Sequence, residues 1–388
     1  MRSETGIIGR REDAAALERS RVVLRPFRLP LSPEDRSRWD DLEQRSLLAN
    51  PFLSSTFILS QPRQRLQECG LQLLTIEREG RWLAAGFFRP ERGTKDMPLP
   101  HLVALPMLHV YKTGLLIDAA ESRTAVHTLW NHLREAGWHG LKFPLFPIGS
   151  PLSLLLNAEC ERRQLGMVTH NQFERAIVSR HQASCHSGIS SARLKSLQRG
   201  SRALERCGEV NLRFNDATLD GGAAIERFLS LESLGWKGLA GVSLLSNADE
   251  AEAFRQIARE FQHQRRICFA ELSAGTDLIA SMCLFRSESD YYAFKIGWNP
   301  EYERGCPGFL LGHLIRRHIG ELAGCERLDG CGRQGIFLDH VWDARKIIAD
   351  AVFPTTRWGS LAAQGSSWGR LALRRLCTLA EIPHCPST

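Results

Sequence analysis

A glycine-containing loop joins a strand-like run to a long apolar-striped segment in the last third of the sequence. The run Tyr291–Gly297 alternates like a strand, and Gly305 and Gly308 precede the helical pattern of Phe309–Leu322. Glycines before a helix N-terminus let backbone N–H groups approach an anion closely, and the helix dipole favours its negative charge. The spacing predicts either an anion site, such as one for a phosphate, or a plain turn and helix cap.

A second distinctive stretch is the basic segment Ser190–Gly208. Its cations are Arg193, Lys195, Arg199, Arg202 and Arg206, and its apolar stripe is Leu194, Leu197 and Leu204. One interpretation is a linker helix with a solvated basic face. The other is a basic wall for an anionic ligand, or a contact for nucleic acid or a membrane surface. A stripe of three leucines is short for membrane insertion, which we do not expect.

The bulk composition is that of a soluble globular protein with room for two domains. The chain has 388 residues, 43% hydrophobic and 24% charged, with a net charge of +7. This mild positive charge suits anionic small molecules and does not by itself indicate DNA or RNA. The first twenty residues are charged throughout and lack an apolar signal-peptide core, so we expect a flexible lead-in over 1–20.

The cysteines and histidines do not have metal-site spacing. The sequence has 11 cysteines and no CxxC pair, and neither Cys185-His186 nor His313 with His318 completes a four-ligand set. We therefore expect reduced thiols, no metal and a cytoplasmic protein. The stretch Gly330–Gly335 fits GxGxxG, but Glu326–Asp329 is a poor buried strand, so a plain loop is the favoured interpretation over a dinucleotide site.

The periodicity predicts the same order of elements twice: strand, two helices, three strands, helix, strand, helix, strand. In the first half the expected elements are Val22–Phe27, a helix from Pro33 to Leu48, Phe57–Cys69, Leu71–Glu77, Trp82–Phe88, His101–Leu108, Gly114–Asp118, Ser122–Ala136, Leu141–Phe146, Leu152–Leu165 and Gln172–Ser179. In the second half they are Val210–Phe214, a helix ending at Leu234, Ala248–Gln264, Ile267–Leu272, Leu278–Phe285, Tyr291–Gly297, Phe309–Leu322, a strand from Arg327, a helix near His340–Asp350 and a strand near Val352–Trp358. The duplication predicts an α+β (α/β) fold of two packed domains, 21–185 and 186–388, each a mixed sheet with helices on its faces.

This order resembles the GNAT acyltransferase fold. Its doubled form resembles the tandem-GNAT group that includes FemAB-like transferases and CelD-like proteins associated with cellulose or exopolysaccharide synthesis. The resemblance rests on three sequence segments: Leu231–Gly238 (LESLGWKG), Asn299–Leu311 and Leu328-Asp329-Gly330. The resemblance covers about 190–360 well and the first half in layout. It implies that each sheet is splayed at its centre.

The resemblance implies that acetyl-CoA, or another acyl-CoA, lies where the fourth and fifth strands splay apart. Its pyrophosphate would then accept hydrogen bonds from N–H groups of Arg304–Phe309. The implied cofactor-binding residues are Gly297, Trp298, Arg304, Gly305, Cys306, Gly308 and Phe309. The loop departs from the usual GNAT pattern, because Pro307 removes one backbone donor.

The corresponding place in the first half is Asp118–Ser122, which has no glycine and two carboxylates. Those carboxylates would repel a pyrophosphate. We expect the first domain to have no cofactor loop and to shape the acceptor cleft instead.

GNAT chemistry is direct attack of an amine or hydroxyl on the thioester, which needs a base for the nucleophile and an acid for the thiolate. The resemblance points to Glu232 and Asp329 as candidate bases. The candidate acids are Tyr292 and Tyr302. Trp236 and Lys237 are the candidate acceptor-binding residues, with Lys237 suited to a carboxylate or phosphate. Each has a plainer alternative, since a helical Glu commonly faces solvent and a Tyr in a strand commonly packs.

Two functions of different class follow. The first is an acyl-CoA-dependent N- or O-acyltransferase acting on a small-molecule or glycan acceptor, such as an amino sugar or polysaccharide precursor. The second is a non-catalytic tandem-GNAT protein that binds a polysaccharide-synthesis assembly. A FemAB-like variant of the first would use aminoacyl-tRNA as donor, with the basic segment contacting the RNA.

Overall fold

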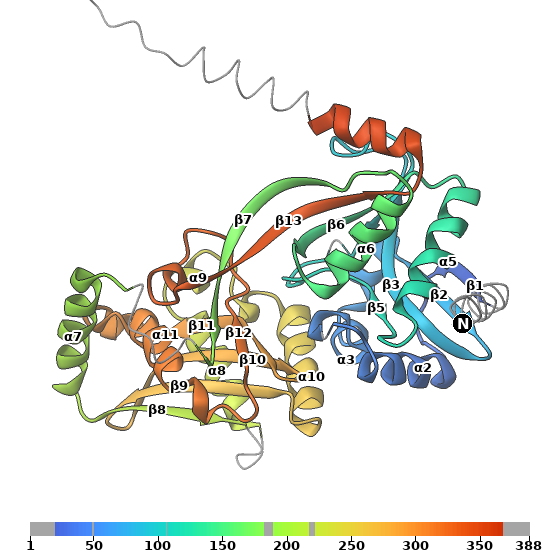
Figure 1. Cartoon of the computed structure of the whole chain (residues 1–388). Coiled ribbons are helices and arrows are strands. Elements are labelled where there is room, and N and C mark those ends of the chain that lie inside the picture. The colour runs from blue at the N-terminus through green and yellow to red at the C-terminus, as the bar shows by residue number, and fades with distance from the viewer. Residues whose placement is uncertain (1–19, 49, 106, 182–188, 217–221, 368–388) are drawn as a thin grey trace, which may run out of the picture. The chain divides into compact units, whose positions relative to one another are not determined.

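The computed structural model describes residues 20–48, 50–105, 107–181, 189–216 and 222–367 (Figure 1). These residues form two compact units that are not consecutive halves of the chain. The first contains 20–48, 69–172 and 349–367, and the second contains 50–68 and 173–348, apart from the gaps just given. The expected domain bounds of 21–185 and 186–388 therefore differ from the compact units, because 50–68 belongs to the second unit and 349–367 to the first. The expected lead-in lies almost wholly outside the described residues.

The first unit has a mixed sheet with helices beside it. Its elements are β1 (Arg21–Pro26), α2 (Pro33–Gln44), β2 (Gln72–Arg78), β3 (Arg81–Glu91), β4 (His101–Ala104), β5 (Leu116–Ile117), α5 (Ser122–Glu135), β6 (Gly140–Pro147), α6 (Pro151–Arg162), the start of β7 (Val168–Ser179) and the end of β13 (Ala344–Pro354). The strand order is β1-β2-β3-β4-β6-β13. Strands β1 to β4 are antiparallel, and β4 pairs with β6 in parallel at Leu102 and Leu141.

The second unit repeats this layout. Its elements are η1 (Pro51–Leu53), α3 (Ser55–Leu59), α4 (Arg63–Glu68), the end of β7, α7 (Ser191–Glu205), β8 (Val210–Asn215), α8 (Ala223–Ser233), α9 (Trp236–Leu239), η2 (Leu244–Ser246), α10 (Ala248–His263), β9 (Ile267–Ala274), β10 (Asp277–Ser287), β11 (Asp290–Trp298), η3 (Pro300–Gly305), α11 (Pro307–Arg317), η4 (Ile319–Glu321), β12 (Arg327–Asp329), η5 (Phe337–His340) and the start of β13. The strand order is β8-β9-β10-β11-β12-β7. Strands β8 to β11 are antiparallel, and β11 pairs with β12 in parallel.

Each unit therefore contains four antiparallel strands followed by a parallel fifth. A parallel neighbour needs a crossover connection, which α5 supplies in the first unit and α11 in the second. The expected α+β class, with mixed sheets flanked by helices, is confirmed.

The two faces of the second sheet are packed differently. Aromatic rings join α8 and α10 to one face, where Phe254 stacks on Phe294 at 5.8 Å between centroids and Phe228 lies 5.4 Å from Phe269. The opposite face carries an aliphatic cluster with α11, in which Leu311 is fully buried. Because side chains alternate along a strand, neighbouring residues of β9 serve both clusters.

Three expected elements differ from the observed ones. The helix expected over Phe57–Cys69 is two short helices, α3 and α4, because Pro62 cannot continue a helical hydrogen-bond ladder. The helix expected near His340–Asp350 and the strand near Val352–Trp358 are replaced by β13 and by a helix over 357–367. The segment Ala344–Asp350 is rich in helix-forming Ala, Arg and Lys, but pairing within the sheet overrides that local preference.

One glycine fixes how closely α8 approaches the sheet. A Cβ added at Gly297 of β11 would lie 2.5 Å from the Glu232 nitrogen and 2.6 Å from the Glu232 Cα. These are backbone atoms, so no side-chain rotation could relieve the clash.

We expect Gly297→Ala to lower the free energy of unfolding by about 2–3 kcal/mol, because overpacking forces α8 away from β11. Urea unfolding of the purified protein measures this loss. The matched control is Gly320→Ala, since Gly320 is exposed and a Cβ there meets nothing within 4 Å. Equal stability of the two variants would contradict this account of the packing.

Candidate functional site

Strands β11 and β12 pair only where they begin. Their parallel register covers Asp290 with Arg327, Tyr291 with Leu328 and Tyr292 with Asp329. Strand β12 ends there, whereas β11 continues to Trp298. On its other side β11 stays paired with β10, with a shift in register between Cys283 and Leu284 that accommodates Phe294 as an extra residue. The second sheet is therefore splayed next to the outgoing half of β11.

The end of β11 leads through η3 into the N-terminus of α11. The N-cap Cys306 has a left-handed conformation (φ 49°), and its side chain makes no capping hydrogen bond. The first intrahelical bond runs from the Leu310 N–H to the Cys306 carbonyl, at 3.0 Å. Pro307 has no N–H, so the N–H groups of Gly308 and Phe309 are the ones that this helix start offers to an anion.

The two glycines that the sequence singled out have different surroundings. A Cβ at Gly305 would lie 2.4 Å from the Leu204 Cγ, so Gly305 allows η3 to pack against α7. A Cβ at Gly308 would meet only Ile296 and Trp298, both at 3.7 Å. Gly308 is therefore the position where a missing side chain leaves room beside the free N–H groups, and Gly305 serves packing.

Helix α7 places cationic side chains beside this helix start. Its buried stripe of Leu197, Gly200 and Leu204 faces η3, and α7 also contacts α11 (Figure 1). On the same stripe, the Arg193 guanidinium lies over the Phe309 ring, 4.9 Å from its centroid. Arg304 and Cys306 are both exposed. The helix dipole and these guanidinium groups all favour an anion at this end of α11.

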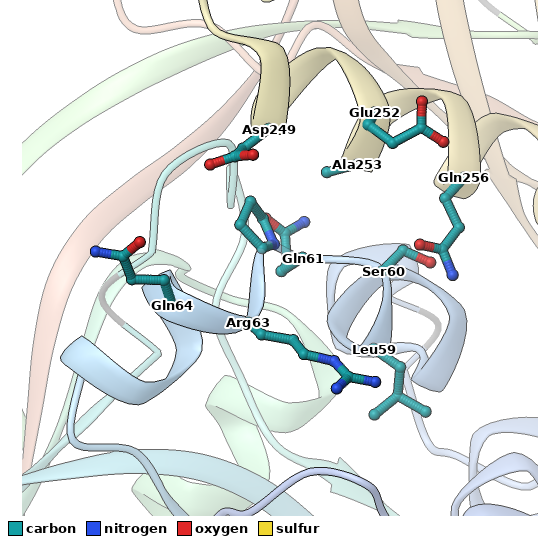
Figure 2. Close-up of a pocket in the computed structure, with 10 residues that line it drawn as sticks. Leu59, Ser60, Gln61, Arg63, Gln64, Asp249, Glu252, Ala253 and Gln256 are labelled. Atoms are coloured by element: carbon teal, nitrogen blue, oxygen red, sulfur yellow. The ribbon is translucent and has the colours of Figure 1, made fainter.

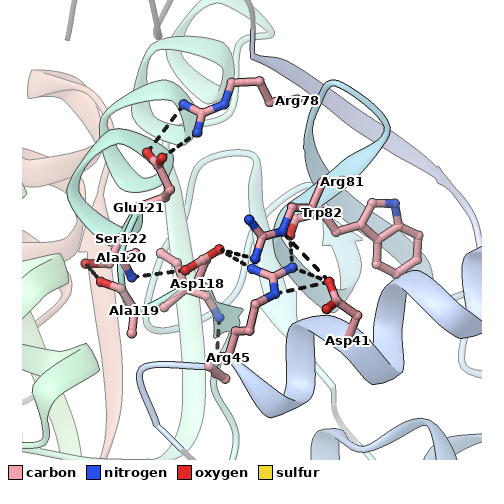
Figure 3. Close-up of polar contacts among 12 residues, drawn as sticks. Asp41, Arg45, Arg78, Arg81, Trp82, Asp118, Ala119, Ala120, Glu121 and Ser122 are labelled. Carbon is pink, nitrogen blue, oxygen red and sulfur yellow. Dashed lines mark hydrogen bonds and ion pairs between the residues drawn. The ribbon is translucent and has the colours of Figure 1, made fainter. Parts of the chain in front are cut away.

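The corresponding helix start in the first unit is filled by its own side chains (Figure 3). Asp118 pairs with Arg45 and lies 3.7 Å from Arg81, while Glu121 pairs with Arg78. The Ala120 N–H donates to Asp118 at 3.0 Å. Because carboxylates already occupy this position, the start of α5 is unsuited to a pyrophosphate.

Glu232 is the centre of a buried charged cluster in the second unit. Its side chain is 0% exposed, and its Oε2 accepts a hydrogen bond from the Leu244 N–H at 2.8 Å. Its Oε1 lies 3.4 Å from Lys237 Nζ and 3.6 Å from Lys295 Nζ, and no hydrogen bond reaches this buried oxygen. Lys237 also donates to the Ile296 carbonyl at 2.5 Å.

This cluster places two sequence candidates, Glu232 and Lys237, in direct contact beside the outgoing half of β11. Burial lowers the pKa of Lys237, although Glu232 acts in the opposite direction. Sequence reasoning missed Lys295. Because Phe294 is an extra residue in the pairing with β10, Phe294 and Lys295 both point to the face of β11 that α8 and α10 cover. Of Trp236, the structure describes the backbone, which begins α9.

Asp329, the other candidate base, lies in a separate network. Its Oδ1 is 3.5 Å from Arg175 and accepts from the Cys331 N–H at 2.8 Å, and its Oδ2 is 3.5 Å from Lys346. Asp329 is opposite Tyr292, whereas Glu232 contacts Gly297 five residues along β11. At the rise of a strand this separates the two carboxylates by roughly 15 Å, so the structure does not bring them together.

The two candidate tyrosines differ in burial and in hydrogen-bond partners. Tyr292 is buried, with its ring 5.8 Å from that of Phe52, and burial raises its pKa well above the ordinary value. The Tyr302 hydroxyl donates to Asp277 at 2.6 Å, and this hydrogen bond raises its pKa to about 12. Both therefore keep their protons at neutral pH.

A polar pocket of about 430 Å³ lies between the α3–α4 segment and α10 (Figure 2). Its lining is Leu59, Ser60, Gln61, Pro62, Arg63, Gln64, Asp249, Glu252, Ala253 and Gln256. Amides, carboxylates and one guanidinium suit a hydroxyl-rich or amine-bearing molecule. None of the candidate catalytic or cofactor residues lines it.

The residues described contain no group of three or more Cys, His, Asp or Glu side chains placed to hold a metal. The stretch Gly330–Gly335 is a loop that leads into η5, without the long helix that a dinucleotide site requires. Among the helices of the described ranges, none combines the length and apolarity needed to cross a bilayer.

Comparison with known proteins gives a family match for the second unit. Residues 191–334 match the family described as acetyltransferase (GNAT) domain. No curated protein matches the sequence.

Solved structures show the same fold at low identity. One is the C-terminal domain of a candidate lysylphosphatidylglycerol synthetase from Agrobacterium fabrum, with a TM-score of 0.51, 14% identity, and coverage of 85% of this chain and 94% of that one. Another is FemX, with a TM-score of 0.51, 8% identity, and coverage of 82% and 95%. The resemblance to FemX agrees with the expected FemAB-like fold, and neither of these two structures bears on the CelD-like group. Residues 191–334 are therefore similar in sequence to GNAT acetyltransferase domains, and the open start of α11 lies beside the splayed strands of this segment.

Proposed function

We propose that the protein transfers an acyl group from acyl-CoA, with acetyl-CoA as the donor, to an amine or hydroxyl of a polar acceptor. The observation that carries this proposal is the α11 start, where two free N–H groups and Arg193 lie next to the splay of β11 from β12. A CoA pyrophosphate would bind Gly308 and Phe309 there, with Arg193 and Arg304 supplying positive charge. The first unit would bind no cofactor, since Asp118 and Glu121 fill its helix start.

The chemical step is attack of the acceptor nucleophile on the thioester carbonyl. The new bond to the acyl carbon forms as the carbon–sulfur bond breaks, the nucleophile loses one proton, and the CoA thiolate gains one. We assign the first proton to Glu232, whose Oε1 has no hydrogen bond although it is buried. The CoA thiolate takes its proton from solvent, because Tyr292 lies five residues along β11 from the contact of Gly297 with Glu232, roughly 15 Å away.

The proposed acceptor is an amino sugar or another hydroxyl-rich precursor. The pocket beside α10 contains none of the candidate catalytic residues, so it supports only a binding subsite for the hydroxyl and ammonium groups of such an acceptor. Lys237 and Lys295 outnumber Glu232 in the buried cluster, which favours an acceptor with a negatively charged group. A FemAB-like aminoacyl-tRNA donor and a non-catalytic binding role are the alternatives.

Calorimetric titration with acetyl-CoA and CoA tests the donor site. We expect saturable binding by the wild-type protein and at least a hundredfold loss in Gly308→Glu, because the new carboxylate would lie where the pyrophosphate binds. A Cβ at Gly308 makes only ordinary contacts, so the fold should tolerate the change. Gly320→Glu, in open space, is the matched control and should bind normally. Absence of wild-type binding up to millimolar CoA would exclude the acyl-CoA donor and favour the alternatives.

Alkylation of Cys306 gives an independent measure of the same site. Cys306 is the exposed N-cap of α11, and Cys207 is an exposed thiol at the end of α7. We expect acetyl-CoA to slow iodoacetamide labelling of Cys306 about tenfold or more and to leave Cys207 unchanged, as read by peptide mass spectrometry. Equal labelling of Cys306 with and without acetyl-CoA would place the donor elsewhere.

Glu232→Gln separates a proton-transfer role from a structural one. The amide oxygen can still accept from the Leu244 N–H, but Lys237 and Lys295 lose their anion, so we expect a lower melting temperature and measure activity well below it. Loss of the base should lower kcat about a hundredfold or more, with the KM for acetyl-CoA unchanged. The readout is CoA release with an acceptor found from a panel of amino sugars. Full activity in this variant would show that Glu232 only anchors the loop that contains Leu244.

A further inference from the structure

An exposed apolar patch lies on the connection between α8 and α10, residues 234–247, which we call the α9 loop. Four of its large side chains face solvent: Leu234 is 44% exposed, Leu239 91%, Val242 54% and Leu245 40%. Single exposed leucines are common, but four within twelve residues are unusual and indicate an interaction surface.

The backbone of the α9 loop is anchored to the sheet. The Leu244 N–H donates to the buried Glu232, and Lys237 Nζ donates to the Ile296 carbonyl of β11. Within the loop, the Val242 N–H donates to the Lys237 carbonyl at 3.0 Å. These bonds hold the loop so that its apolar side chains point away from the core, which makes them available to a partner without refolding.

The outward face of α7 carries a cluster of positive charge. Lys195, Arg199, Arg202 and Arg206 are all exposed, and within the described ranges none of them forms an ion pair. The α7 residues that face the protein are Arg193, Leu197, Gly200 and Leu204, so the four outward cations take no part in packing or at the α11 start.

Segment η3 contacts both the α9 loop and α7. Gly235 of the α9 loop lies against Pro300, the first residue of η3, where an added Cβ would be 3.7 Å from the proline ring. The last residue of η3, Gly305, contacts Gly200 of α7 through its carbonyl. A six-residue 3₁₀ segment spans roughly 10 Å, so the loop and the helix flank one short stretch of chain.

We propose that the α9 loop and α7 together dock the protein on an anionic lipid bilayer surface. The leucines and valine would enter the boundary between headgroups and acyl chains, while the four cations bind anionic headgroups. Helix α7 has too few apolar residues to do this alone, and the α9 loop supplies them. This contact is peripheral and spans no bilayer. It is independent of the acyl-transfer proposal.

Vesicle co-sedimentation of the full chain tests this proposal. We expect binding to vesicles of phosphatidylcholine mixed with phosphatidylglycerol, and at least tenfold weaker binding to phosphatidylcholine alone. Because each cation near an anionic surface contributes about fivefold, Arg199→Gln with Arg202→Gln should weaken binding roughly twenty-five-fold. The matched control is Arg123→Gln with Arg134→Gln on α5, where both arginines are exposed.

The apolar contribution has its own variants. Leu239→Asp with Val242→Asp should abolish sedimentation with anionic vesicles, while circular dichroism and acetyl-CoA binding stay unchanged. Trp358→Asp with Leu361→Asp is the control, since these side chains are 71% and 62% exposed on the helix over 357–367. Equal loss in both pairs would show a nonspecific effect of added charge and overturn the assignment.

Two further outcomes would overturn the proposal. The first is failure of the wild-type protein to sediment with anionic vesicles at low ionic strength. The second is binding of total tRNA that depends on Arg199 and Arg202 but not on Leu239, with no vesicle binding, which would assign the α7 face to RNA. In either case the calorimetric titration with acetyl-CoA stands by itself, so failure of docking and failure of acyl transfer are distinguishable.

Discussion

The separation of β11 from β12 after Tyr292 and Asp329 is the constraint on which the second unit depends. Pairing stops after three residues, and the chain of β11 continues with one edge no longer matched to β12. Backbone N–H and C=O groups near an unpaired strand edge need other hydrogen-bond partners. The Ile296 carbonyl finds one in Lys237, whose Nζ donates to it. The same divergence directs the chain through η3 into α11, so the open helix start lies beside the splay.

The buried cluster around Glu232 connects the sheet to the α9 loop. Gly297 lets the α8 backbone contact β11, and this approach brings Glu232 within reach of Lys237, Lys295 and the Leu244 N–H. Burying a carboxylate with two ammonium groups is costly unless nearly every polar atom is satisfied. Glu232 Oε1 has no hydrogen bond and contacts the two ammonium groups as ion pairs, at 3.4 Å and 3.6 Å. The cluster therefore serves both as an anchor and as the proposed site of proton transfer.

The two units share one layout and differ at the start of the crossover helix. Both have four antiparallel strands, a crossover helix and a parallel fifth strand. At the start of α5, Asp118 and Glu121 satisfy nearby N–H and guanidinium groups within the protein. At the start of α11 no side chain caps the helix, and Cys306 leaves the first N–H groups open. The difference lies in a few residues at the helix start.

The sequence by itself determined the α+β class, the repeated order of elements and the loop before α11, because alternation, helical periodicity and glycine spacing are local signals. The resemblance also offered Glu232 and Lys237 as candidates, and the structure places these two side chains in contact. The tertiary structure decided that Gly305 packs against Leu204, that Asp329 pairs with Arg175 and Lys346, and that Lys295 joins Glu232. It also decided that β13 is a strand, against the helix preference of its residues. These outcomes depend on contacts between segments that are far apart in the sequence. Local sequence patterns do not indicate which of those segments will meet or which side chains the contacts will bury.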